Sequence, residues 1–142
     1  MLKILLPVDG STNATRAVTH VVGHESWYRD PLELHLLNVQ LPVASGVVKS
    51  FIKPSQLNDY YRDESLAIMK EARAVLESAK RPYQRHIGVG DLATTILDYA
   101  RELQCDLIAM GTHGRGAFAG ALLGSVAAKV VSAAPVPVLL IK

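Results

Sequence analysis

Short apolar runs alternate along this chain with segments of helical character, and this alternation limits the folds that the chain can adopt. The runs lie at 2–8, 32–40, 83–89, 106–110 and 134–141. The first and fourth are apolar on both faces, as strands are in the middle of a parallel sheet. Strands that alternate with helices form a parallel sheet with helices on both faces. We therefore predict an α/β fold with a single open five-stranded parallel sheet.

The polar content of the runs indicates which strands lie at the sheet edges. Run 83–89 contains Gln84, Arg85 and His86, which suit an edge strand. Pro135 and Pro137 confine the last run to an edge or to a strand start. Right-handed crossovers and a central switch point then favour the Rossmann-like order 3-2-1-4-5 within one domain, residues 1–142.

The segments between these runs predict the helices. Four helices are expected: one capped by Ser11 or Thr12, one over 57–80, one capped by Asp91 and running to about 104, and one opening near Ser125. The segment 41–56, which prolines and a glycine interrupt, is predicted to be irregular. Its apolar residues suggest a lid over a ligand or a patch for a partner.

A glycine-punctuated stretch, 111–125, directly follows the fourth run. Glycines let the backbone approach a ligand closely, so that several N–H groups converge on one point. The helix that opens after Gly124 adds its unpaired N–H groups and the positive end of its dipole, and Ser125 would cap it or turn its hydroxyl to a phosphate. Arg115 adds a positive charge and His113 a further donor. We interpret this stretch as a phosphate-binding loop.

A second site-like turn follows the first apolar run. Asp9 stands at the carboxyl end of that strand, where open α/β sheets bind their ligands. In the predicted order the first and fourth strands are neighbours. Asp9 and Gly111 would therefore face each other across one crevice, and the two turns would form one site.

The glycine spacing resembles a known signature. Gly111-x-x-Gly114, nine residues, then Gly124-Ser125 is similar to the ATP-binding motif of the universal stress protein family. The opening Pro7-Val8-Asp9-Gly10-Ser11 and the closing Ala-Pro-Val-Pro-Val at 134–138 resemble the same family, so the resemblance covers nearly the whole chain. It implies an adenine nucleotide alpha-hydrolase-like form of the predicted fold.

The resemblance also implies which residues hold a nucleotide. By this resemblance the phosphates are held by Gly111, Gly114, Arg115, Gly124 and Ser125, and the adenosine half by Pro7, Val8, Asp9 and Val39, with Met110, Thr112, His113 and Val126 completing the site. The implied cofactor is ATP, or ADP or AMP, with Mg²⁺ held through the phosphates and Asp9 as its one metal-binding residue.

Taken together, these features favour a dimeric ATP-binding stress or regulatory protein that uses nucleotide occupancy as a signal. The family resemblance implies a homodimer through strand 136–141. The Walker A pattern is absent, and no nucleophile has a plausible base, so we expect at most a weak ATPase. Two alternatives remain: a slow nucleotide-hydrolysing or phosphoryl- or adenylyl-transfer enzyme, and an interaction module that uses 41–56 and the last strand beside a vestigial nucleotide site.

Composition argues against several other classes of partner. Charged residues make up 20% of the chain and the net charge is +2, which is too mild to indicate nucleic acid. No apolar run is long enough to span a bilayer. Cys105, the single cysteine, lies next to a buried strand and is predicted to be an inert core thiol. We expect a cytoplasmic protein.

Two further patterns resemble binding motifs but lack residues that those motifs require. Gly88-x-Gly90-x-x-Ala93 matches the dinucleotide fingerprint, but it follows a predicted edge strand, and Met110 stands where the acidic ribose ligand belongs. His20 and His24 share a helix face, but no third zinc ligand lies at a suitable spacing. We interpret these histidines as solvated surface residues.

Overall fold

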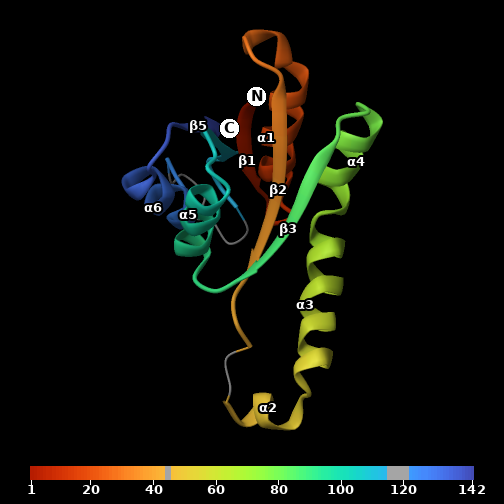
Figure 1. Ribbon diagram of the computed structural model, residues 1–142. Helices are drawn as coiled ribbons and strands as arrows, with labels where there is room; N and C mark the ends of the chain where they lie inside the picture. Colours follow the sequence, from red (N-terminus) through yellow and green to blue (C-terminus); the bar gives the residue numbers. More distant parts are fainter. Residues whose placement is uncertain (44–45, 115–121) are drawn as a thin grey trace.

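A five-stranded parallel sheet with the order β3-β2-β1-β4-β5 runs through the centre of the protein (Figure 1). The computed structural model describes residues 1–43, 46–114 and 122–142. Both the α/β class and the strand order were predicted from the sequence, and both are confirmed. β1 lies in the middle, where Leu5 pairs with His35 of β2 on one side and with Ile108 of β4 on the other.

The described elements alternate between strand and helix along most of the chain. In chain order they are β1 (Leu2–Pro7), α1 (Thr12–Gly23), the 3₁₀ turn η1 (Glu25–Trp27), β2 (Leu32–Gln40), α2 (Gly46–Phe51), α3 (Pro54–Ile68), α4 (Lys70–Ser78), β3 (Tyr83–Val89), α5 (Leu92–Glu102), β4 (Leu107–Gly111), α6 (Ser125–Ala133) and β5 (Val138–Ile141).

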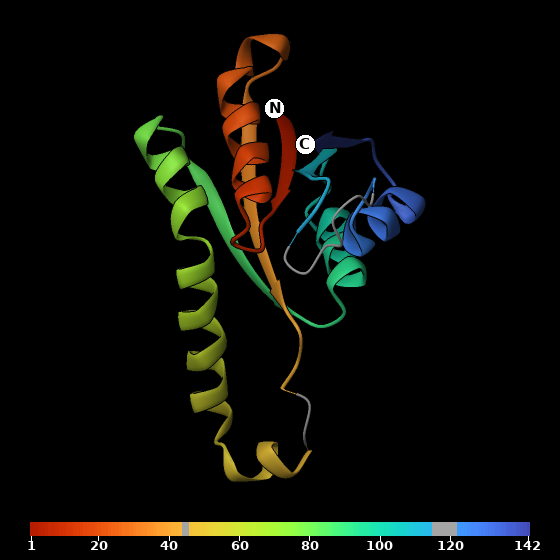
Figure 2. The same cartoon turned by 180° about the vertical axis from the view of Figure 1, so that it is seen from behind.

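Helices cover both faces of the sheet, and each face has its own hydrophobic core. Ile4, Leu6 and Leu36 pack with residues of α1 and α4 on one face. Leu5 and Ile108 pack with residues of α5 and α6 on the other. The two groups of helices lie on opposite sides of the sheet in both views (Figures 1 and 2). Period-2 alternation in the strands produces these two cores, because successive side chains point to opposite faces.

The predicted helix over 57–80 is wrong in its bounds and in its continuity. The helical segment begins at Pro54, because proline suits the first helical turn, and the side chain of Gln56 accepts a hydrogen bond from the Lys53 N–H at 3.1 Å. It is then interrupted at Met69, a fully buried residue that separates α3 from α4. No proline or glycine marks this interruption, and Met69 packs in the core with residues of α1, α4 and β1.

Two smaller predictions also need correction. Segment 41–56 is not irregular throughout, because α2 occupies Gly46–Phe51. The N-cap of α6 is Gly124, and Ser125 is the first helical residue, so Ser125 does not cap the helix. The other two predicted caps are confirmed. The side chain of Ser11 accepts from the Ala14 N–H at 3.2 Å, and that of Asp91 from the Thr94 N–H at 3.0 Å.

The segment that holds α2 and the first half of α3 extends beyond the carboxyl end of the sheet (Figures 1 and 2). We call residues 46–60 the arm. Phe51, an apolar residue of this segment, is 84% exposed. The arm is therefore set apart from both hydrophobic cores.

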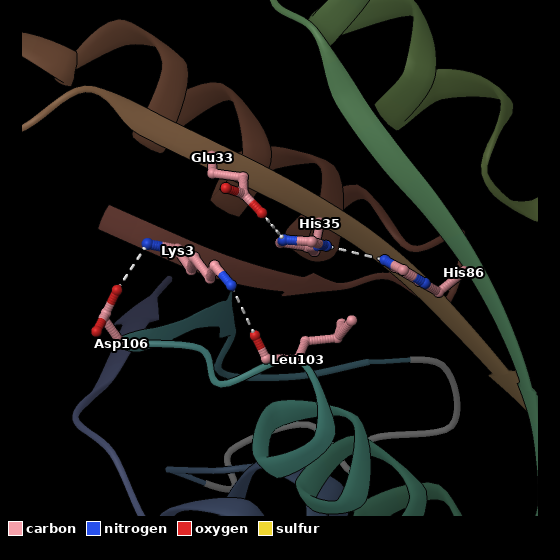
Figure 3. Close-up of polar contacts among 6 residues, drawn as sticks. All are labelled: Lys3, Glu33, His35, His86, Leu103 and Asp106. Carbon is pink, nitrogen blue, oxygen red and sulfur yellow. Dashed lines mark hydrogen bonds and ion pairs between the residues drawn. The ribbon is translucent and has the colours of Figure 1, made fainter. Parts of the chain in front are cut away.

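Polar contacts extend from the opposite, amino end of the sheet to its middle (Figure 3). The Lys3 backbone N–H donates to Asp106 Oδ2 at 2.8 Å, and the Lys3 Nζ donates to the Leu103 carbonyl at 3.3 Å. These bonds fasten β1 to the turn between α5 and β4. His35 is 2% exposed and bonds to both Glu33 and His86.

Candidate functional site

A cavity of about 410 Å³ opens at the carboxyl ends of β1, β2 and β4. This volume lies in the range typical of small-molecule sites, and the position is where open α/β sheets bind ligands. The cavity is lined by Pro7, Val8, Asp9, Ala14, Leu37, Asn38, Val39, Gln40, Leu41, Tyr60, Glu64, Ile68, Leu92, Ile96, Met110, Gly111, His113, Gly114, Gly124, Ser125, Val126 and Ala127.

The structure brings the sequence-predicted site residues together around this cavity. All of those that it describes line the cavity except Thr112, which is buried beside it. Arg115 and the middle of the glycine stretch lie outside the described residues. The crevice predicted between strands 1 and 4 is thus present, with Asp9 and Gly111 among its lining residues.

Asp9 and Gly114 meet across this crevice although they lie far apart in the sequence. Asp9 Oδ1 accepts a hydrogen bond from the Ser11 N–H at 2.9 Å, which fixes the carboxylate in the turn after β1. A Cβ on Gly114 would collide with Asp9 Oδ2. Glycine at 114 therefore leaves room for the carboxylate at the wall of the cavity.

A backbone hydrogen bond joins the two described parts of the glycine stretch, residues 111–114 and 122–125. The Gly124 N–H donates to the Thr112 carbonyl at 2.7 Å, which ties the start of α6 to the end of β4. A Cβ on Gly124 would lie 3.3 Å from that carbonyl oxygen and 3.4 Å from the His113 Cα. The N-terminus of α6 is thereby held at the cavity, where its N–H groups and dipole favour an anion.

A buried polar network supports the opposite wall, and sequence reasoning missed it. Asn38, 2% exposed, donates through Nδ2 to the Val8 carbonyl at 2.9 Å and accepts from Ser65 Oγ at 2.7 Å. Gln40 Nε2 donates to Ser65 Oγ at 2.7 Å and to the Tyr61 carbonyl at 2.8 Å. These bonds lock β2 to β1 and to α3. The polar Asn38 and Gln40 in a leucine-rich run were the available signals.

The helix α3 supplies a third wall that the sequence did not predict. Tyr60, Glu64 and Ile68 line the cavity from one side of this helix. Their spacing follows the helical repeat, which places residues four apart on one face. That face turns toward the cavity because α3 packs beside β2. Such packing is a tertiary contact, which local sequence patterns do not reveal.

The cavity lining does not include Cys105, His20 or His24. Burial raises the pKa of the Cys105 thiol to about 11, which keeps it protonated and agrees with the predicted inert core thiol. His20 and His24 stack at 4.0 Å between ring centroids, beside Trp27. Over the described ranges, no group of three or more metal-ligating side chains is found. Within the same ranges, no helix is long and apolar enough to cross a membrane.

Comparison with known proteins identifies a family for the whole chain. The sequence model of the universal stress protein family matches residues 1–142. A universal stress protein of Thermus aquaticus is 32% identical over 139 residues, which cover 98% of this chain and 97% of that protein. The family match includes all the residues that line the cavity.

Solved structures show the same architecture. The hypothetical protein MJ0577 superposes with a TM-score of 0.83 at 30% identity, covering 99% of this chain and 95% of that one. A universal stress protein family protein from Arabidopsis thaliana, solved with AMP bound, superposes with a TM-score of 0.66 at 22% identity. That match covers 100% of this chain and 92% of the other, and it shows a shared fold.

Proposed function

The chain belongs to the universal stress protein family, and on that premise we propose that it is an adenine-nucleotide-binding regulatory protein. Its ligand is ATP, or ADP or AMP, and it binds in the cavity at the carboxyl ends of β1, β2 and β4. Nucleotide occupancy is the signal that the protein carries. It forms a homodimer through residues 136–141.

One observation carries the proposal: the predicted nucleotide-binding residues converge on a single cavity. Asp9 follows β1, Val39 lies near the end of β2 and Gly124 precedes α6, yet all three line the same space. Its apolar walls suit a base and its α6 N-terminus suits a phosphate. That the structural relative from Arabidopsis thaliana was solved with AMP supports an adenine nucleotide as the occupant.

Asp9 fits a role in holding Mg²⁺. Magnesium prefers oxygen ligands and is commonly held by one or two carboxylates together with the phosphates of the bound nucleotide. The carboxylate of Asp9 lies at the cavity wall, beside Gly114 of the phosphate-binding stretch. Magnesium there would offset the negative charge of the phosphates, and Asp9 would orient the ion.

The first test replaces Gly124 by valine. Because a Cβ at this position already lies tight against the Thr112 carbonyl, the branched side chain of valine does not fit unless the cavity wall beside the proposed phosphate site shifts. We expect Gly124→Val to abolish binding of ATP with Mg²⁺, measured by titration calorimetry. The wild type is expected to bind one nucleotide per chain.

The matched control is Gly23→Val, because a Cβ on Gly23 meets no atom within 4 Å. This variant should bind as the wild type does. If the wild type binds neither ATP nor AMP, the proposed function is wrong. If Gly124→Val binds ATP unchanged, the function survives but the site is elsewhere. Sustained release of phosphate over many turnovers would favour the hydrolase alternative.

A further inference from the structure

Asn13, in the first turn of α1, joins two segments that are distant in the sequence. Its Oδ1 accepts a hydrogen bond from the His113 backbone N–H at 2.8 Å. Its Nδ2 donates to the Ile141 carbonyl at 3.1 Å. One amide therefore connects the beginning of the glycine stretch to the end of β5.

The packing at Gly111 shows how closely α1 approaches this region. A Cβ on Gly111 would collide with Asn13 Oδ1 and would lie 3.0 Å from the Asn13 backbone carbonyl carbon. Glycine at 111 thus makes room for Asn13. Sequence reasoning assigned Gly111 to the phosphates alone and gave Asn13 no role.

The Ile141 carbonyl receives a second hydrogen bond in the same place. The Thr112 N–H donates to it at 2.9 Å, and the Thr112 carbonyl in turn accepts from the Gly124 N–H at 2.7 Å. A continuous set of hydrogen bonds therefore runs from Asn13 and β5 through Thr112 to the N-cap of α6. Both described ends of the glycine stretch depend on it.

We propose that Asn13 is a positioning residue for the phosphate half of the ligand. It does not line the cavity; it acts by holding the His113 backbone, and with it residues 111–114, at the cavity wall where the proposed site places the phosphates. The inference rests on the proposed function and adds to it a residue on α1. Since the adenosine half is held by other segments, removing this anchor penalises phosphate-bearing ligands selectively.

The test compares adenosine with AMP and ATP. In Asn13→Ala we expect affinity for AMP and ATP to fall by about tenfold, the loss typical of removing a hydrogen-bonded anchor. Affinity for adenosine should change little, so the ratio of the AMP to the adenosine dissociation constant rises by the same factor. General destabilisation of the fold would not separate the two ligands in this way.

Asn58→Ala is the matched control, because Asn58 is an exposed asparagine on α3 outside the cavity lining. It should leave all three affinities unchanged. An Asn13→Ala protein with wild-type affinity for AMP, or with equal losses for adenosine and AMP, overturns the inference. A wild type that binds none of the three ligands overturns the proposed function itself.

A measurement on the wild type needs no variant and no ligand. The His113 amide hydrogen should exchange slowly with solvent, since it is bonded to Asn13 Oδ1. Fast exchange at His113, with slow exchange at the Thr112 amide, would show that the bond to Asn13 does not hold the stretch in solution. That result would also overturn the inference.

Discussion

At the scale of single residues, Glu33, His35 and His86 form a line of hydrogen bonds across β2 and β3 (Figure 3). The Glu33 carboxylate only accepts, so His35 carries its proton on Nε2, at 2.9 Å from Glu33 Oε1. His35 Nδ1 is then the acceptor for His86 Nε2–H, also at 2.9 Å. The line thus fixes the tautomer of both rings.

This line predicts a loss of stability in mild acid. Burial, and then the nearby His35, lower the pKa of His86 from the ordinary 6.5. The folded state therefore binds fewer protons than the unfolded state as the pH falls through 6.5, and the free energy of unfolding decreases. His86→Gln, which keeps a donor toward His35, should lose less stability than the wild type between about pH 8 and about pH 5.5. Urea unfolding at both pH values measures this, and equal losses in the two proteins would contradict it.

At the scale of elements, the structure decides which residue caps the first helix, for which the sequence offered both Ser11 and Thr12. Ser11 is the cap, and its hydroxyl accepts from the Ala14 N–H. Ser11→Ala should lower the free energy of unfolding by about 1 kcal/mol. Thr12→Ala, at an exposed position one residue later, should change it by less than about 0.5 kcal/mol. Thermal and urea unfolding of both variants test the assignment, which fails if Thr12→Ala is the more damaging.

The elements also show which kinds of structure the sequence could predict. Apolar runs such as Leu2–Pro7 and the cap at Asp91 carry local signals, and they were found within one or two residues of their bounds. The interruption at Met69 has no local signal, since no proline or glycine stands there, and Met69 packs in the core with residues distant in the sequence. Local patterns predict elements, whereas tertiary contacts decide where a helix bends.

The candidate site divides in the same way. The spacing of the glycines and the position of an aspartate directly after a strand can be read from the sequence, so Asp9 and Gly114 could be predicted as site residues. Asn13 and Glu64 could not, because nothing next to them in the chain indicates which segment they will meet. Both are brought near the site by helix packing.

At the scale of the whole molecule, β5 is an edge strand that pairs with β4 alone in the described sheet. The carbonyls of Pro137 and Ile141 accept from Ile108 and Thr112, so alternate residues of β5 direct their backbone groups toward β4. The N–H of Leu140 therefore points to the open side. An apolar strand with such an open edge is suited to pair with a second copy.

The proposed homodimer predicts different outcomes for two substitutions at one position. Leu140→Pro removes the outward N–H and should convert a dimer to a monomer in sedimentation equilibrium. Leu140→Ala loses the same packing against the core but keeps the N–H, so it should remain dimeric. A monomeric wild type would exclude the proposed dimer. A dimer that survives Leu140→Pro would place the subunit contact elsewhere.

The burial of Cys105 has a practical consequence for studying this protein. The chain contains one cysteine, and its thiol is buried, with its pKa raised to about 11. It will not react with maleimides at neutral pH, because these reagents need an accessible thiolate. A cysteine introduced at Phe51 would therefore be the only thiol to take a fluorophore. Labelling the arm needs no prior removal of a native cysteine, so the emission of a single probe on the arm can be followed as nucleotide is added.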